Sequence, residues 1–217
     1  MLRAKLTIAG SNFIFSHINE NYNEYLSKEK KLRVIYRGIN IDYYNLKNIS
    51  ILKQEKLKKE WNLSSNKFTI LLPGRLTYWK GQEKFIESLN ILIEDYNVNN
   101  FQAIILGSDQ GRKVYSKKLI NLVERYNLNK KIKFIEHCKE MPLAYSLSDV
   151  VVSTSIEPEA FGRISVEAQS MGKPIIASNI GGSKETVINK KTGLLYKYDD
   201  PRELAKCLNA VIQLSPD

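Results

Sequence analysis

The sequence is poor in cysteine and histidine, and it has no long apolar run. Its 217 residues include only two cysteines, Cys138 and Cys207, and two histidines. So few cysteines suit a reducing compartment, and they exclude a disulfide scaffold or a cysteine-ligated metal framework. No stretch approaches the roughly 20 consecutive apolar residues of a membrane-spanning helix. The short apolar run behind Met1 does not have the pattern of a signal peptide. We therefore expect a cytoplasmic protein.

Internal repeats and glycine- or serine-rich linkers are also absent, and the remaining composition is that of a folded protein. Hydrophobic residues make up 43% of the chain and charged residues 26%, which excludes a collagen-like or mainly disordered chain. The formal net charge of +10 favours anionic partners such as nucleotides, acidic lipids or nucleic acid. Most of the basic residues are lysines, so we assign part of this charge to ordinary solvated surface.

Short apolar segments alternate with segments of helical periodicity. Phe68–Pro73 and Val150–Ser153 are apolar on both faces, as strands are in parallel sheets covered by helices. Gln82–Tyr96 repeats apolar residues at three- and four-residue spacing, and Pro201 is placed to open a last helix. This alternation predicts an α/β fold, a doubly wound open parallel sheet with helices on both faces. The predicted strands are Leu6–Ala9, Arg33–Tyr36, Phe68–Pro73, Ala103–Leu106, Ile132–Ile135, Val150–Ser153, Pro174–Ala177 and Leu194–Tyr196.

The loops that follow the strands are the places to look for chemistry, because ligands of such sheets bind beyond the carboxyl ends of the strands. The loop after Phe68–Pro73 carries Arg75 and Lys80, bounded by Gly74 and Gly81. A planar guanidinium beside the point charge of a lysine suits a diphosphate. The alternative is an exposed loop with ordinary surface charges, and on this motif alone the two interpretations weigh equally.

The loop after Val150–Ser153 holds a second group of candidates. Glu159 precedes a helix that Gly162 is expected to open, and Glu167 lies at the edge of the buried face of that helix. Two carboxylates, together with the free N–H groups from Phe161 onward, can bind a hydroxylated ligand that carries a phosphate. Alternatively, both glutamates are terminal charges that interact favourably with the helix dipole.

A third loop, Asn179–Thr186, follows the predicted strand Pro174–Ala177. Its paired glycines, Gly181 and Gly182, can let the backbone approach a ligand. Its polar residues need no ligand to explain them, since Glu185 is expected to be an acid in the first turn of a helix. We leave the role of the glycines open.

Five motifs in register carry a resemblance to a known family. They are Gly-Arg-Leu-Thr-x-Trp-Lys-Gly-Gln at 74–82, the spacing Glu159-x7-Glu167, and the segments Arg33–Tyr44, Phe134–Ser155 and Thr192–Tyr196. This set resembles the GT-B glycosyltransferases of family 4, the glycosyl transferases group 1. The resemblance covers essentially the whole chain. It implies a Rossmann-like domain, the C-terminal, donor-binding half of a GT-B fold.

The resemblance also implies roles for individual residues. Arg75 and Lys80 would bind the donor diphosphate and stabilise charge on the leaving group. Glu167 would accept hydrogen bonds from the ribose hydroxyls, and Glu159 would hold hydroxyls of the donor sugar, with the nucleobase near the loop after Ile132–Ile135. The candidate catalytic residues are thus Arg75, Lys80 and Glu159, and the candidate binding residues are Gly74, Arg75, Lys80, His137, Cys138, Glu159, Phe161, Gly162 and Glu167.

The implied reaction is transfer of a hexose, with retention, from a UDP-sugar or GDP-sugar to a glycan or lipid acceptor, without a metal or other cofactor. The sequence has no Asp-x-Asp motif, and neither histidine lies near carboxylates in ligand spacing. Cations and a helix dipole would then neutralise the charge of the diphosphate. An acceptor in cell-envelope glycan biosynthesis would bring the protein to the inner face of the membrane.

The chain departs from the family in length, because a GT-B enzyme has two Rossmann-like domains. Residues 1–27 resemble only the last strand and helix of the N-terminal domain, and residues 28–217 resemble a C-terminally truncated nucleotide-sugar-binding domain. The alternative to an enzyme is therefore a non-catalytic nucleotide-sugar-binding fragment, or a subunit of a split enzyme whose acceptor domain is a separate chain. A basic module for acidic membranes or nucleic acid ranks below both, and a sugar-nucleotide epimerase is a remote alternative.

Overall fold

A six-stranded parallel sheet forms the centre of the molecule. The computed structural model describes residues 6–22 and 31–214. The strand order is β5-β4-β3-β6-β7-β8, and every neighbouring pair is parallel. The strand order changes direction between β3 and β6, and ligands of open α/β sheets bind at such a switch point. The strands are β3 (Phe68–Pro73), β4 (Phe101–Leu106), β5 (Ile132–Ile135), β6 (Val150–Ser153), β7 (Ile175–Ser178) and β8 (Leu194–Tyr196).

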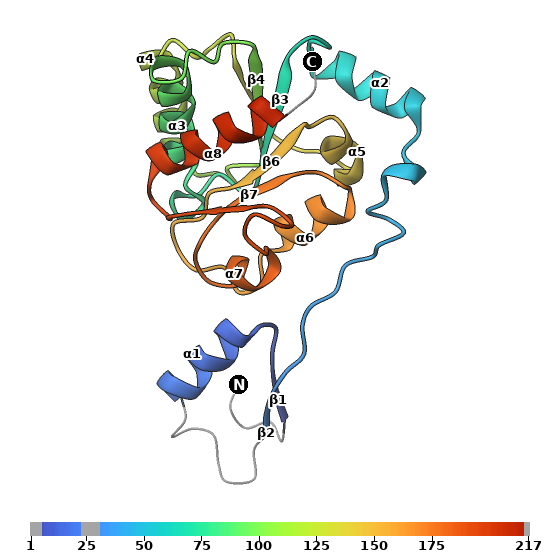
Figure 1. The fold of residues 1–217 in the computed structure, drawn as a ribbon, viewed down its shortest axis with the longest axis vertical. Coiled ribbons are helices and arrows are strands. Elements are labelled where there is room, and N and C mark those ends of the chain that lie inside the picture. The colour runs from blue at the N-terminus through green and yellow to red at the C-terminus, as the bar shows by residue number, and fades with distance from the viewer. Residues whose placement is uncertain (1–5, 23–30, 215–217) are drawn as a thin grey trace.

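Helices cover both faces of this sheet, as Figure 1 shows. Alternate residues of β3 point to opposite faces. Ile70 and Leu72 pack in one apolar cluster with α3, α4 and α8, whereas Leu71 packs in a second cluster with α5 and α6. Among the helices described here, none is long and apolar enough to cross a membrane. The helices around the sheet are α2 (Ile51–Glu60), α3 (Gln82–Glu94), α4 (Lys113–Arg125), α5 (Met141–Ser146), α6 (Arg163–Ser170), α7 (Ser183–Thr186) and α8 (Pro201–Leu214).

The predicted fold class, an open parallel sheet with helices on both faces, is confirmed. Six of the eight predicted strands form this sheet, with bounds that agree to within two residues. The last helix begins at Pro201 as predicted, and the helix predicted over Gln82–Tyr96 ends at Glu94. Prediction succeeded here because the strands are apolar on both faces and the helices carry apolar residues on one face.

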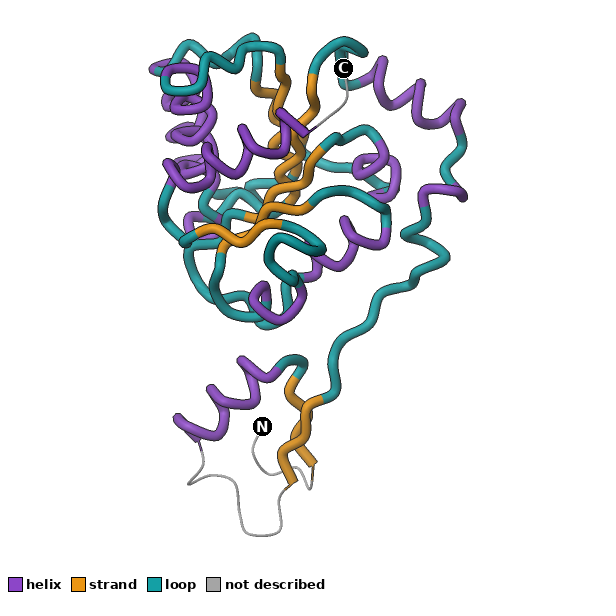
Figure 2. Tube along the Cα trace, in the orientation of Figure 1, coloured by secondary structure: helices purple, strands orange, loops and turns teal. Residues whose placement is uncertain are grey.

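The first residues form a separate small β-α-β unit, made of β1 (Leu6–Ala9), α1 (Asn12–Tyr22) and β2 (Lys31–Val34). β1 and β2 pair in parallel as a two-stranded sheet, and Figures 1 and 2 show it apart from the six-stranded sheet. The strand predicted at Arg33–Tyr36 therefore lies two residues earlier and pairs with β1. The predicted boundary between residues 27 and 28 lies outside the described residues, so the division into domains stays a prediction.

Candidate functional site

A hollow of about 320 Å³ lies beyond the carboxyl ends of β3, β4 and β5, next to the switch point. Its walls come from the loops that follow these three strands and from α5 and α6. Such a place is where the topology predicts a ligand. The residues that line it are Pro73, Gly74, Arg75, Leu106, Gly107, Ser108, Glu136, His137, Cys138, Met141, Tyr145, Ile164 and Glu167.

The loops after β3 and β6 meet at backbone distance. Gly81 has a φ of +67°, and a Cβ atom there would lie 2.0 Å from the carbonyl oxygen of Thr154. The Thr154 hydroxyl donates to the carbonyl oxygen of Lys80 at 2.7 Å, and the backbone N–H of Ile156 donates to that of Trp79 at 2.9 Å. Only glycine fits this approach. The approach brings Lys80 beside the loop that carries Glu159.

Lys80 and Glu159 form a nearly buried ion pair. Lys80 Nζ lies 2.7 Å from Glu159 Oε1, and the two side chains are only 11% and 12% exposed. The Ser155 hydroxyl also donates to Glu159 Oε1. Lys80 Nζ lies 4.4 Å from the ring centroid of Trp79, within the range of a cation–π interaction. The structure therefore joins the predicted diphosphate cation directly to the predicted sugar-binding carboxylate.

Arg75 lies beside this pair and also faces the hollow. Its guanidinium carbon is 5.9 Å from the Trp79 ring centroid, so both cations lie close to the same ring. The Gln82 side chain donates to the carbonyl oxygen of Arg75 at 2.8 Å, which ties the loop to the start of α3. A Cβ atom at Gly74, which lines the hollow, would lie 3.6 Å from the Lys80 side chain. Lys80 thus lies against Gly74 at the edge of the hollow, while Arg75 lines it.

Glu167 lines the hollow from α6, and it is 5% exposed. The Tyr145 hydroxyl donates to its Oε2 at 2.7 Å. Arg163 donates to its Oε1 through Nη2 at 2.6 Å and through Nε at 3.0 Å. A buried carboxylate needs such partners because burial without them is costly. The sequence placed Glu167 at the edge of a buried face but gave no partner for it.

The pKa values around Glu167 reflect its charge. Burial, followed by the negative charge of Glu167, raises the pKa of Tyr145 well above that of a free tyrosine. The same two causes raise the pKa of Tyr44 to about 12. Hydrogen bonds to Glu167 and its charge raise the pKa of Arg163. The two tyrosines beside the Glu167 carboxylate therefore stay neutral.

The glycines of the third loop approach the second loop. Gly181 has a φ of +57°, and a Cβ atom there would lie 2.7 Å from the backbone nitrogen of Glu159. The backbone N–H of Gly182 donates to the carbonyl oxygen of Glu159 at 2.7 Å. These contacts give the paired glycines, whose role the sequence left open, a function in supporting the backbone at Glu159.

The start of α6 is also tied to the small N-terminal unit. Gly162, with a φ of +85°, is the cap of α6, and Phe161 is 8% exposed. The Ser11 hydroxyl donates to the carbonyl oxygen of Ala160 at 2.5 Å. Sequence reasoning missed Ser11, because nothing local indicates a partner 149 residues away.

His137 and Cys138 lie on the rim shared by the 320 Å³ hollow and a neighbouring hollow of about 500 Å³ beside α2. Burial raises the pKa of the Cys138 thiol, which favours a packed side chain over a reactive thiolate. Within residues 6–22 and 31–214, no three or more His, Cys, Asp and Glu side chains gather where they could hold a metal ion.

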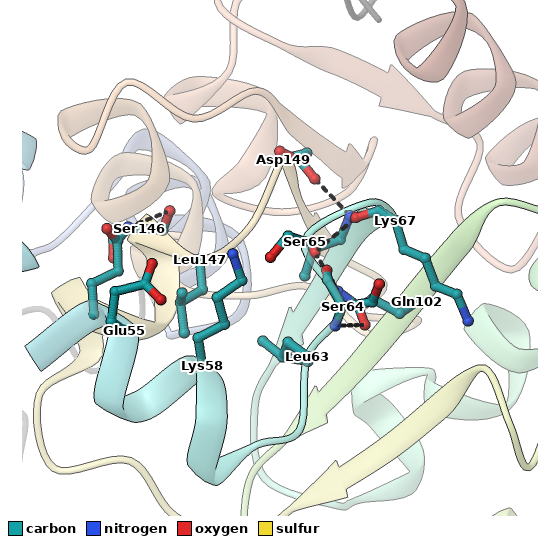
Figure 3. Close-up of a pocket in the computed structure, with 12 residues that line it drawn as sticks. Glu55, Lys58, Leu63, Ser64, Ser65, Lys67, Gln102, Ser146, Leu147 and Asp149 are labelled. Carbon is teal, nitrogen blue, oxygen red and sulfur yellow. Dashed lines mark hydrogen bonds between the residues drawn. The ribbon is translucent and has the colours of Figure 1, made fainter.

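A hollow of about 160 Å³ lies at the opposite, amino-terminal ends of the strands (Figure 3). Its polar groups bond one another: Gln102 donates to the carbonyl oxygen of Ser64 at 2.9 Å, and Asp149 accepts from the backbone N–H of Thr69 at 2.6 Å. Lys58 and Lys67 line it. This hollow lies at the edge of the sheet where ligands do not usually bind, and its polar groups are already paired with one another. The hollow at the carboxyl ends of the strands is therefore the candidate site.

Comparison with known proteins gives one family. The sequence profile described as "Glycosyl transferases group 1" matches residues 53–217. The chain is 25% identical over 192 residues to the D-inositol 3-phosphate glycosyltransferase of Corynebacterium glutamicum, an alignment that covers 88% of this chain and 45% of the relative.

Solved structures agree with the profile. A glycosyltransferase from Rickettsia africae ESF-5 is 33% identical, with a TM-score of 0.88 over 95% of this chain and 53% of its own. Anabaena HepE, solved in complex with UDP-glucose, is 30% identical, with a TM-score of 0.84 over 97% of this chain and 54% of its own. The chain thus spans about half the length of the proteins it matches.

Proposed function

The chain belongs to the glycosyl transferases group 1 family, and we propose that it forms the donor-binding half of a retaining glycosyltransferase that uses a UDP-sugar or GDP-sugar. The observation that carries this proposal is the hollow at the switch point, with Arg75 on one wall, Glu167 on another and the Lys80–Glu159 pair beside it. The complex of HepE with UDP-glucose supports a nucleotide-sugar donor.

Arg75 and Lys80 are the proposed ligands of the diphosphate. An ammonium group has three donors, so Lys80 can keep its bond to Glu159 while it donates to a phosphate oxygen. When the bond between the sugar and the diphosphate breaks, negative charge builds up on the leaving nucleotide. Two cations already held in place stabilise this charge without reorganisation, and we propose that they do so without a metal ion.

Glu159 is the proposed ligand of the donor sugar. The bonds from Lys80 and Ser155 both fall on its Oε1, so we assign Oε2 to a sugar hydroxyl. The carboxylate is nearly buried and paired with the Lys80 ammonium group, which holds it in place as an acceptor. Glu167, which also lines the hollow, is the proposed ligand of the ribose, and the base would rest near the loop of His137 and Cys138.

Transfer also requires an acceptor, because positioning both substrates supplies a large part of the rate. We propose a glycan or lipid acceptor held by a second domain, on the same polypeptide or on a separate chain, at the cytoplasmic face of the membrane. The alternative function is nucleotide-sugar binding without turnover. Formation of a glycosylated product or hydrolysis of the donor by the 217-residue chain would rule out that alternative.

Isothermal titration with UDP, GDP and UDP-glucose tests the donor site. The chain is expected to bind one of the two nucleotides, and the double substitution Arg75→Ala with Lys80→Ala is expected to abolish the binding. The matched control is Lys58→Ala with Lys67→Ala, which removes two cations from the hollow at the opposite edge. The control is expected to keep the affinity within about twofold. Absence of nucleotide binding, or equal affinity in both double variants, would overturn the assignment.

A further inference from the structure

Tyr145 is a completely buried residue of α5 whose only polar side-chain atom meets Glu167. Its exposure is 0%, and its hydroxyl donates to Glu167 Oε2 at 2.7 Å. Both residues line the 320 Å³ hollow. A buried tyrosine needs a hydrogen-bond partner, but this one has bonded the carboxylate that the proposed function assigns to the ribose.

The hydrogen bonds of the carboxylate are divided unequally between its two oxygens. An ionised carboxylate has about four acceptor positions, two on each oxygen. Arg163 fills both positions of Oε1 with its Nε and Nη2 groups. Tyr145 fills one position of Oε2. Among the residues that the structure describes, no second hydrogen bond reaches Oε2, although the Tyr44 phenol also interacts with this carboxylate.

We propose that Tyr145 is a positioning residue for the nucleotide ribose: it holds Glu167 Oε2 so that the remaining acceptor position of this oxygen faces a ribose hydroxyl. The inference rests on the proposed function and extends it to a residue that binds no ligand itself. Arg163 cannot hold the carboxylate in this way alone. Its side chain is 59% exposed, so packing constrains it less than the completely buried Tyr145.

The packing around Tyr145 fixes its hydroxyl. The Tyr145 ring meets the Tyr44 ring edge-on at a centroid distance of 6.1 Å. Tyr44 is held in turn, because its carbonyl oxygen accepts a bond of 2.7 Å from the Ser170 hydroxyl at the end of α6. The end of α5 is held by Lys173, whose Nζ donates to the carbonyl oxygen of Ser146 at 3.1 Å. The phenol therefore has a fixed place relative to α6.

A thermodynamic cycle between one side chain and the ribose hydroxyls tests the inference. The probes are UDP and 2′,3′-dideoxy-UDP, or the guanosine pair if the chain binds GDP, titrated into the wild-type chain and into Tyr145→Phe. We expect Tyr145→Phe to weaken UDP binding about tenfold and to change binding of the dideoxy analogue less than twofold. A loss of packing alone would weaken both ligands equally.

The control is Tyr196→Phe, which removes another buried phenol hydroxyl, from β8 on the other face of the sheet. It is expected to leave the UDP to dideoxy-UDP ratio of the wild-type chain unchanged. Tyr145→Met is a second variant that fills the buried site with an apolar side chain and also lacks the hydroxyl, and it should give the same selective loss if Tyr145→Phe does not fold.

The outcomes separate the inference from the proposed function. Equal losses for both ligands in Tyr145→Phe, or no loss for either, would overturn the positioning role and leave the donor site intact. Failure of the wild-type chain to bind either nucleotide would overturn the proposed function, and the inference with it.

Discussion

Replacing Gly81 by alanine tests whether the loops after β3 and β6 form one site. Gly81 has a φ of +67°, and its Cβ atom would lie 2.0 Å from the carbonyl oxygen of Thr154. Gly172, after the end of α6, has a φ of +65°, and a Cβ atom there would meet nothing within 4 Å. Gly172→Ala therefore carries the same backbone strain without the collision, and it is the matched control.

The expected losses of stability follow from the backbone strain and from the collision with Thr154. The left-handed conformation costs an alanine about 1–2 kcal/mol, and this is the whole cost expected for Gly172→Ala. Gly81→Ala adds a displacement of the Thr154 backbone by about 1 Å. Overpacking of this kind costs about 1–3 kcal/mol more. The total for Gly81→Ala is therefore about 2–5 kcal/mol.

Urea denaturation followed by circular dichroism measures the free energy of unfolding of the Gly81→Ala and Gly172→Ala chains. The comparison holds when the slope of this free energy against urea concentration is the same in both variants. Nucleotide titration should separate the variants further. Gly81→Ala moves Trp79 and Lys80 and is expected to weaken UDP binding, whereas Gly172→Ala should leave it unchanged. Equal losses of stability in the two variants, with equal affinities, would show that the two loops do not support one another.

Three further outcomes follow from the contacts of the site. In urea denaturation, Lys80→Ala and Glu159→Ala should show a coupling energy of about 1–3 kcal/mol, whereas additive effects would mean that their ion pair contributes nothing. Burial opposes ionisation of Glu185, but the N–H groups of Asn12 and Phe13 outweigh it and lower its pKa. The ionised Glu185 carboxylate therefore contributes its full stabilisation of the folded chain above its unfolded pKa of about 4.3. This contribution is lost as the pH falls through the lower pKa of Glu185 in the folded chain. Melting temperatures of Glu185→Gln should thus fall less between about pH 5 and pH 3 than those of the wild type, and parallel curves would contradict this. Finally, UDP affinity should be equal in excess EDTA and excess Mg²⁺; a gain of about tenfold with Mg²⁺ would refute binding by cations of the protein alone.

The sequence predicted the sheet well because its strands are buried on both faces, a property that each segment carries by itself. It did not predict which sheet a strand joins. Lys31–Val34 alternates between exposed and half-exposed residues, and its partner is β1, reached through α1. Pairing is a non-local property, so a strand at the end of the small unit was assigned to the sheet that follows it in the chain.

In the candidate site, too, the local features were predicted and the non-local contacts were not. Arg75, Lys80, Glu159 and Glu167 were chosen from loop position, helix register and resemblance, all of which are local. Their partners were not found, because Tyr145 lies 22 residues from Glu167 and on a different helix. The one available signal was a tyrosine in a short apolar segment before β6. A buried phenol there must find a polar partner, but the sequence does not say which one.

Glu185 shows how a correct local interpretation can miss the main contact. It lies in the first turn of α7, as expected, but its carboxylate accepts the backbone N–H groups of Asn12 at 2.8 Å and Phe13 at 2.7 Å, at the start of α1. Ser11 bonds Ala160, the residue next to Glu159, from the same end of α1. The small unit therefore contacts the second loop through Ser11 and the start of α7, after the third loop, through Asn12 and Phe13. Gly181 and Gly182, just before α7, support the backbone at Glu159. A shift of α1 would therefore reach Glu159 through both the second and the third loop.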